Sequence, residues 1–206
     1  MKDKEVKGLY ALGKASWYDK FKSLWNKTIA NKAENELNLF LKGNINKNTS
    51  ILELGCGTAL NLEKINYLNL KFKKYLGIDF SIDMLNIARK KFKSNKLVKF
   101  EYRDITKLNN KEKFDIIICT WVLSHLDSPS DIINKSQKLL KNNGKMFIIL
   151  FSEPKWYLNY WFPPLSRIFF KCYPVSNNEL LKFNNVRVLH KYSNNMVTAV
   201  TIWNKN

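Results

Sequence analysis

A sharp glycine turn lies in the segment Ile51-Leu52-Glu53-Leu54-Gly55-Cys56-Gly57-Thr58-Ala59-Leu60, and the fold class follows from it. The residues before the turn read as a short strand, and those from Leu60 to Leu68 read as a helix. Gly55 and Gly57 stand where the strand turns into the helix, so a ligand can approach backbone N–H groups there without meeting a Cβ atom. In an open α/β sheet, the first strand-to-helix loop is where ligands bind.

Strand and helix patterns alternate on both sides of this turn. Repeated strand-helix-strand order implies a doubly wound α/β sheet with right-handed crossovers. We expect Asn142-Asn143-Gly144 to end the last helix of the series as a left-handed stop. The strands are expected at residues 50–54, 73–79, 97–102, 114–119 and 145–151, and the helices at 60–68, 81–92 and 131–141.

Two regions flank this core. After a short helix near residues 177–182, the chain closes with 186–192 and 196–203, which read as an antiparallel hairpin. We therefore expect an N-terminal helical cover, residues 1–48, and one domain, residues 49–206. Residues 15–41 of the cover should form a helical face that carries Trp17, Phe21, Leu24, Trp25, Ile29 and Ala33.

Acidic residues stand at the ends of the next two strands. Asp79 ends the second strand, where a carboxylate could accept hydrogen bonds from two ribose hydroxyls, and Asp104 follows the third. One acid at the carboxyl edge of the sheet could be chance. Acids at two successive strand ends after a glycine turn form a pattern that indicates a nucleoside-containing ligand.

These motifs resemble the cofactor motifs of class I S-adenosylmethionine-dependent methyltransferases. The resemblance covers roughly half of the chain, from about Ser50 to Leu150, with the motifs in the family's order. It implies a Rossmann-like fold, with a seven-stranded, mostly parallel sheet whose last strand is antiparallel. It also implies S-adenosyl-L-methionine as cofactor and S-adenosyl-L-homocysteine as product. The matching segments are residues 53–58, 77–81, 103–105, 114–119 and 140–145.

The resemblance also implies roles for individual residues. Gly55 and Gly57 would pass the methionine part of the cofactor, with Glu53 bracing the loop beneath it. Asp79 would hold the ribose hydroxyls, and Asp104 would accept a hydrogen bond from the adenine amino group. The further cofactor contacts that we expect are Tyr18, Cys56, Phe80, Met84, Ile105 and Thr120.

The chain departs from the family pattern at Ala59, where a third glycine is usual. The dinucleotide fingerprint also tolerates alanine at its last position, so we expect a functional loop with slightly tighter packing. A hydride-transferring dehydrogenase is the rival interpretation of a glycine turn. The spacing Gly55-x-Gly57-x-Ala59 and the acid at Asp104 disfavour it.

Methyl transfer from a sulfonium is a direct displacement, so an enzyme mainly aligns the reacting groups. Residues 120–125 follow the fourth strand, where the methyl group would point. His125 is our candidate general base, and a purely structural histidine is the alternative.

An aromatic segment, residues 151–174, lies between the fifth strand and the closing hairpin and holds nine aromatic residues. Three interpretations compete for it: additional core, a pocket for a hydrophobic substrate, or contact with a membrane surface. The candidate substrate contacts are Trp121, Trp156, Tyr160 and Trp161.

The chain of 206 residues carries a net charge of +18, from 35 Lys and Arg against 17 Asp and Glu. Few of these cations are arginine and they are spread along the chain, which favours a solvated surface and argues against a nucleic-acid partner. An anionic membrane surface remains open as a peripheral partner. Three scattered cysteines argue against a zinc site, and a start without a signal-peptide pattern predicts a cytoplasmic protein.

We therefore expect a methyltransferase whose acceptor is a small molecule, hydrophobic or lipid-like. One alternative is an RNA methyltransferase, although Cys119-Thr120-Trp121-Val122 replaces the Asn/Asp-Pro-Pro-aromatic motif of nucleic-acid enzymes. The other is a non-catalytic protein that binds S-adenosylmethionine. Calorimetric titration with the cofactor and its product tests the enzyme interpretation.

Overall fold

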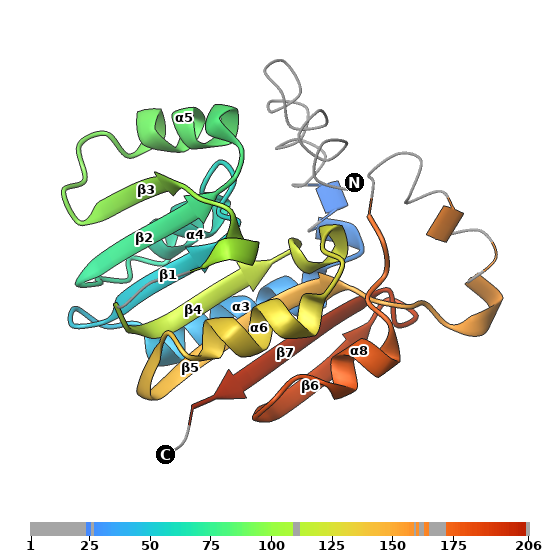
Figure 1. Ribbon diagram of the computed structural model, residues 1–206. Coiled ribbons are helices and arrows are strands. Elements are labelled where there is room, and N and C mark those ends of the chain that lie inside the picture. The colour runs from blue at the N-terminus through green and yellow to red at the C-terminus, as the bar shows by residue number, and fades with distance from the viewer. Residues whose placement is uncertain are drawn as a thin grey trace.

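The computed structural model describes residues 24, 25, 27–108, 112–158, 160, 163–164 and 172–204. Trp17, Tyr18, Phe21 and Trp161 therefore lie outside the described residues. Within them, a central sheet carries helices on both faces (Figure 1). Among the described residues, no helix combines the length and apolar composition needed to cross a membrane.

The sheet has seven strands in the order β3-β2-β1-β4-β5-β7-β6. Strands β1 to β5 are parallel to their neighbours, and β7 is antiparallel to both β5 and β6. This confirms the expected doubly wound sheet with an antiparallel last strand. The strands are β1 Ser50–Leu54, β2 Lys74–Asp79, β3 Val98–Tyr102, β4 Phe114–Thr120, β5 Leu140–Phe151, β6 Val186–Tyr192 and β7 Val197–Trp203.

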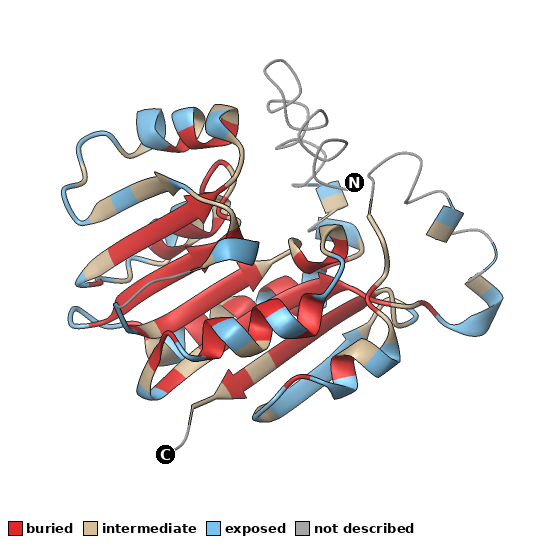
Figure 2. Cartoon of the chain, viewed as in Figure 1, coloured by how far each residue is buried: buried red, intermediate tan, exposed pale blue. Residues whose placement is uncertain are grey.

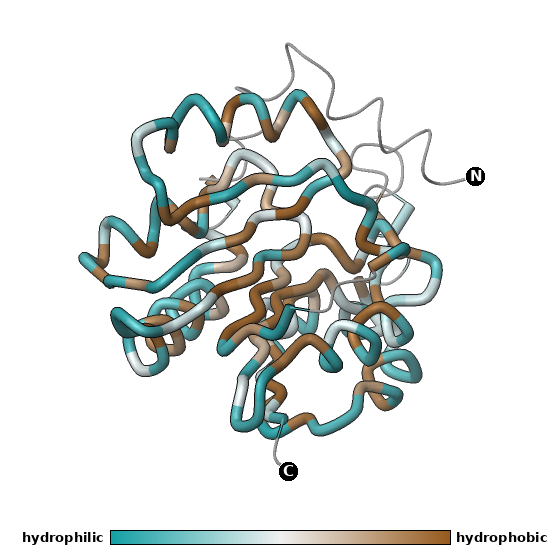
Figure 3. Tube along the Cα trace, turned by 60° about the vertical axis from the view of Figure 1, so that its left-hand side comes forward, coloured by the Kyte–Doolittle hydropathy of each residue, from teal (hydrophilic) through white to brown (hydrophobic). Residues whose placement is uncertain are grey.

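Two apolar layers cover the sheet because successive side chains of a strand point to opposite faces. Ile51 packs in the layer below α3, α4 and α5, whereas Leu52 packs in the layer below α6 and α8. The central strands are largely buried on both faces, and most of their side chains are apolar (Figures 2 and 3). The helices are α3 Asn31–Asn44, α4 Leu60–Tyr67, α5 Ile82–Lys91, α6 Pro129–Gln137 and α8 Asn177–Leu181, with 3₁₀ turns η1 Ile105–Lys107, η2 Leu123–His125 and η3 Trp156–Leu158.

The expected end of the helix at 131–141 was wrong. Helix α6 stops at Gln137, and the Asn-Asn-Gly triplet lies inside β5 at an irregularity in its pairing with β4. Asn143 has a left-handed φ of 61°. Its N–H donates to the carbonyl of Asn204 at 2.9 Å, and the N–H of Asn204 donates to the carbonyl of Gly144 at 3.0 Å. The triplet therefore bends a strand, with partners supplied by the end of the chain.

The N-terminal cover differs in detail from the expected helix. Helix α3 begins at Asn31 and runs three residues beyond the expected end. Leu24 is 63% exposed and does not belong to the buried face. The residues of α3 that pack on the sheet are Ala33, Leu37, Phe40 and Leu41.

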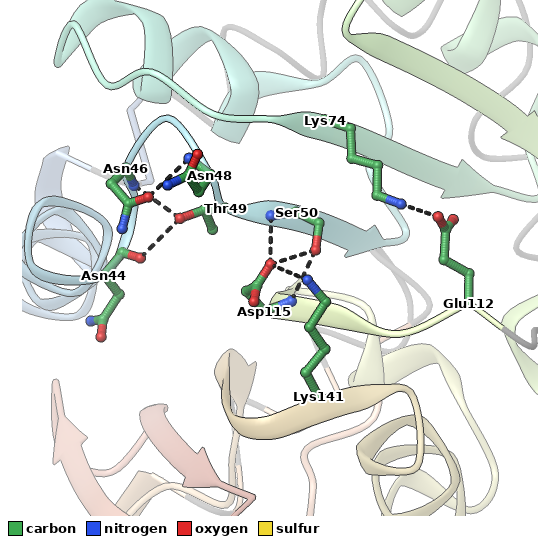
Figure 4. A network of polar contacts seen from close by, with 9 residues as sticks. All are labelled: Asn44, Asn46, Asn48, Thr49, Ser50, Lys74, Glu112, Asp115 and Lys141. Carbon is green, nitrogen blue, oxygen red and sulfur yellow. Dashed lines mark hydrogen bonds and ion pairs between the residues drawn. The ribbon is translucent and has the colours of Figure 1, made fainter.

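A polar network joins the strands at their amino ends, opposite the predicted site (Figure 4). One carboxylate oxygen of Asp115 in β4 accepts from the backbone N–H of Ser50 at 2.8 Å and from its hydroxyl at 2.6 Å. The same oxygen accepts from Nζ of Lys141 in β5 at 2.8 Å. Partial burial alone would raise the pKa of Asp115, but the hydrogen bonds from Lys141 and Ser50 hold it below its usual range. Asp115 thus ties β1, β4 and β5 together.

We predict that Asp115→Ala lowers the free energy of unfolding by about 1–3 kcal/mol, because the fully buried N–H of Ser50 loses its acceptor. Urea denaturation measures the change. Glu112→Gln is the control, because its ion pair with Lys74 is exposed and should contribute less than about 1 kcal/mol. Equal losses in the two variants would contradict this role for Asp115.

Candidate ligand site at the carboxyl ends of the strands

The glycine loop leads from β1 into α4 and has glycine at two positions with a left-handed backbone, one of which is also closely packed. Gly55 and Gly57 have left-handed φ angles of 67° and 52°. A Cβ atom on Gly55 would lie 2.3 Å from Cγ2 of Val122, whereas a Cβ atom on Gly57 would meet nothing within 4 Å. The side chain of Val122 therefore fills the space where a Cβ atom on Gly55 would stand, while the space beside Gly57 is open.

The carboxylate of Asp79 orders this loop and the start of the next helix. Its Oδ2 accepts from the N–H of Gly57 at 2.8 Å, and its Oδ1 accepts from the N–H of Ser81 at 2.8 Å. Ser81 in turn caps α5 by accepting from the N–H of Met84. Burial raises the pKa of Asp79 above its usual value, although these N–H groups oppose the shift. A carboxylate has further lone pairs, so Asp79 can accept additional hydrogen bonds from a ligand.

Glu53 lies beneath the loop and is 2% exposed. Its Oε1 accepts from Nδ2 of Asn61 at 2.9 Å, and its Oε2 accepts from the hydroxyl of Tyr75. The same Nδ2 group donates to Oγ1 of Thr120 at 2.9 Å. Burial raises the pKa of Glu53 to about 7, although the hydrogen bonds from Tyr75 and Asn61 lower it. One buried network therefore joins the glycine-loop helix to the end of β4.

The predicted adenine-side residues lie at the ends of β2 and β3. The N–H of Arg103 donates to the carbonyl of Asp79 at 2.9 Å, which holds the two strand ends together. Oδ1 of Asp104 accepts from the N–H of Thr106 at 2.8 Å and from its hydroxyl at 2.7 Å. Ile105 and Met84 are buried, whereas Phe80 and Asp104 are half-buried.

Two further residues of the loop, Cys56 and Ala59, have local features that the sequence did not indicate. The sulfur of Cys56 lies only 2.8 Å from where a Cβ atom on Gly77 would stand, so its side chain points into the sheet. Its N–H donates to the carbonyl of Ile78 at 3.0 Å. Ala59 has a left-handed φ of 66°, so alanine here affects the backbone conformation, beyond the packing effect that we expected.

The end of β4 and the loop after it carry three predicted residues, each with different contacts. Thr120 joins the Glu53 network, and Trp121 donates from Nε1 to Oε1 of Glu34 at 3.1 Å. His125 is half-buried in η2, and its Nε2 lies 3.6 Å from the sulfur of Cys172.

Trp156 and Tyr160 of the aromatic segment are 80% and 81% exposed, so neither belongs to the core. The start of this segment is fixed to the hairpin turn. The N–H of Lys155 donates to the carbonyl of Asn194 at 2.9 Å, and the hydroxyl of Tyr157 donates to Oδ1 of the same residue at 3.0 Å. These contacts fix where the segment leaves the sheet.

Sequence reasoning missed Asn61, Tyr75 and Glu34, which hold predicted residues in place. Asn61 and Glu34 are buried polar side chains in helices, and Tyr75 is a buried hydroxyl in a strand. A polar residue at a core-facing position was the available signal, because such groups need a partner.

The strand order reverses between β1 and β4, and the glycine loop lies at that switch point. Ligands of open α/β sheets bind there, outside the carboxyl ends of the strands. Together with the buried acid that ends β2, this arrangement defines a Rossmann-like protein with a candidate ligand site at the switch point.

A family model described as "Methyltransferase domain" matches residues 45–196, and the chain belongs to this family. Among curated relatives, the "Ubiquinone biosynthesis O-methyltransferase" of Pelagibacter ubique is 36% identical over 104 residues, which cover 50% of this chain and 42% of the relative. The "(S)-coclaurine N-methyltransferase" of Papaver somniferum is 30% identical over 145 residues, which cover 62% of this chain and 40% of the relative. The matches thus span less than half the length of these two relatives.

Among solved structures, the fold is similar to that of the N-methyltransferase NodS from Bradyrhizobium japonicum, which was crystallised with S-adenosyl-L-homocysteine. The TM-score is 0.65 at 16% identity, and the match covers 86% of this chain and 87% of that one. This likeness supports the Rossmann-like methyltransferase fold.

We predict that Gly55→Ala destabilises the protein by roughly 1–3 kcal/mol more than Gly57→Ala, because both meet the left-handed φ but only Gly55 meets Val122. Thermal or urea unfolding measures both variants. Adding Val122→Ala to Gly55→Ala should recover part of the loss. A double variant that is no more stable than additivity predicts would contradict the proposed overlap.

We predict that Glu53 makes stability depend on pH. Because its pKa is raised to about 7 in the folded state, folding keeps a proton that the unfolded chain has released. This contribution is complete below about pH 4.5 and is lost as the pH rises through about 7, with a slope of up to ~1.4 kcal/mol per pH unit. Urea denaturation between pH 5 and 8 measures it.

Glu53→Gln should flatten this part of the profile, because an amide does not titrate. Glu63→Gln, a carboxylate in α4 paired with Lys91 at a more exposed position, should keep the wild-type slope. Parallel profiles for wild type and Glu53→Gln would contradict the raised pKa.

Proposed function

We propose that this chain binds S-adenosyl-L-methionine at the carboxyl ends of β1, β2 and β3 and catalyses methyl transfer to a small, hydrophobic acceptor. The observation that carries the proposal is the position of Asp79. One buried carboxylate accepts from the glycine loop at Gly57 and from the start of α5 at Ser81. An acid so placed can also accept hydrogen bonds from the two hydroxyls of a ribose.

The residues present fit this cofactor. The open space beside Gly57 leaves room for a ligand next to a backbone that no Cβ atom covers. The buried acids Glu53 and Asp79 suit a ligand that carries positive charge at sulfur. Asp79 would hold the ribose, Asp104 and Ile105 the adenine edge, and Phe80 and Met84 the adenine faces.

When bound, the cofactor supplies an electrophilic methyl group on a sulfonium. The chain's own contribution is alignment, because displacement at carbon requires the attacking and leaving atoms to lie in line. Glu53 holds α4 through Asn61, and the same amide fixes Thr120 at the end of β4. His125, in the loop that follows, would accept the proton of an acceptor that loses one on methylation.

A hydrophobic acceptor is supported by the aromatic residues of this side. Trp121 follows β4 directly. Trp156 and Tyr160 lie in the segment that follows the carboxyl end of β5, and both residues are exposed. The name of one relative assigns it to ubiquinone biosynthesis, which supports an acceptor of the same hydrophobic kind for this chain. The same exposed rings, on a chain of net charge +18, support an anionic membrane surface as a peripheral partner.

Isothermal titration with S-adenosyl-L-methionine and S-adenosyl-L-homocysteine tests the proposal. We predict that the wild type binds both and that Asp79→Asn weakens binding at least about tenfold, since one ribose acceptor becomes a donor. Glu63→Gln should bind as the wild type does. Absence of binding to the wild type would overturn the proposal.

Turnover is then measured as S-adenosyl-L-homocysteine released with catechol, a small phenol, and with total RNA. Release with catechol supports the small-molecule acceptor. Release with RNA alone would overturn that part of the proposal.

A further inference from the structure

Trp121 has an unusual backbone for a bulky residue. It directly follows β4, and its φ of 66° lies in the left-handed region that such side chains rarely adopt. Its N–H donates to the carbonyl of Ile149 in β5 at 2.7 Å. A residue keeps this conformation only where its surroundings hold it, and such positions concentrate at functional sites.

The left-handed turn sends two neighbouring side chains to opposite sides of the sheet. The indole of Trp121 packs in the layer below α3 and α4, whereas Val122 packs in the layer below α6. Val122 is also the side chain that fills the space beneath Gly55. The side chain that supports the glycine loop is therefore the direct chain neighbour of Trp121.

Glu34 holds the indole in this place. Glu34 is 8% exposed, and its Oε1 accepts from Nε1 of Trp121 at 3.1 Å. Its Oε2 pairs with Nζ of Lys64 in α4, the helix that begins at the end of the glycine loop. One buried carboxylate thus connects α3, α4 and the loop after β4. Trp25 adds an edge-to-face contact with the Trp121 ring, with the centroids 6.0 Å apart.

We propose that Glu34 is a positioning residue for the cofactor loop, acting through Trp121 and Val122. By holding the indole, Glu34 stabilises the left-handed turn, and the turn keeps Val122 beneath Gly55. Without the carboxylate, the turn relaxes in the free protein and must be restored when ligand binds, which weakens binding. This inference rests on the proposed function, because it assumes that the loop contacts the cofactor.

Glu34→Leu and Glu34→Gln test the proposal, with S-adenosyl-L-homocysteine as the probe. Glu34→Leu removes the acceptor for the indole and should weaken binding about tenfold, the equivalent of 1.4 kcal/mol. Glu34→Gln keeps an amide oxygen for Nε1 and should bind within about threefold of the wild type. Glu63→Gln breaks a second ion pair of α4, with Lys91, and should leave the affinity unchanged.

Rescue by glutamine separates positioning from a merely structural role. If Glu34 only stabilises the fold, both variants should melt at lower temperature and bind the probe as the wild type does while folded. Equal affinity of wild type and Glu34→Leu would therefore overturn the proposal. Val122→Ala should reproduce the loss of affinity without disturbing the indole.

The indole N–H gives a readout that does not depend on the cofactor. In a protein labelled with ¹⁵N-tryptophan, Trp121→Phe identifies the signal of Nε1–H by its loss. We expect this proton to exchange slowly in the wild type and in Glu34→Gln, and faster in Glu34→Leu. If the wild type fails to bind the probe, the proposed function fails, and unchanged exchange in Glu34→Leu overturns the positioning role separately.

Discussion

The structure of the site depends on one buried carboxylate, that of Asp79. Its two oxygens accept from the N–H groups of Gly57 and Ser81, so the glycine loop and the start of α5 share one anchor. Burying this charge is costly, and the raised pKa reflects the cost of desolvation. The surrounding backbone donors offset part of that cost and leave the carboxylate able to accept from a ligand. The same carboxylate thus fixes the glycine loop and is the candidate acceptor for the cofactor.

The amino ends and the carboxyl ends of the strands contribute differently to stability and to the candidate site. At the amino ends, Asp115 joins β1, β4 and β5 and contributes to stability. At the carboxyl ends, the left-handed Ala59 and Trp121 carry a conformational cost, and the buried Glu53 carries an electrostatic cost. The apolar layers on both faces of the central strands offset the cost of the groups at the carboxyl ends.

Much of the fold could be predicted from local patterns. Apolar runs predicted the buried strands, and the helix expected at 81–92 corresponds to α5, which Ser81 caps. The closing hairpin was also expected, and the three residues of its turn, Ser193, Asn194 and Asn195, all have positive φ. The Asn-Asn-Gly triplet in β5 misled the prediction because a left-handed asparagine can end a helix or bend a strand. Its partner, Asn204, is distant in sequence, so no local pattern could decide.

The candidate site was predictable to the same degree. Gly55, Gly57 and Asp79 lie together as the motif spacing implied, because short loops at adjacent strand ends leave them little freedom. The side chains that support them come from elsewhere in the chain. Glu34 reaches Trp121 from α3, and Tyr75 reaches Glu53 across neighbouring strands. Such contacts depend on tertiary packing, which a single sequence does not reveal.

The most direct test of this account is a crystal structure of the chain grown with S-adenosyl-L-homocysteine. The account predicts that both ribose hydroxyls lie within hydrogen-bonding distance of the Asp79 carboxylate, with the homocysteine part beside Gly57. Density for the ligand away from Asp79, or a crystal grown at saturating ligand without it, would contradict the central role of this carboxylate.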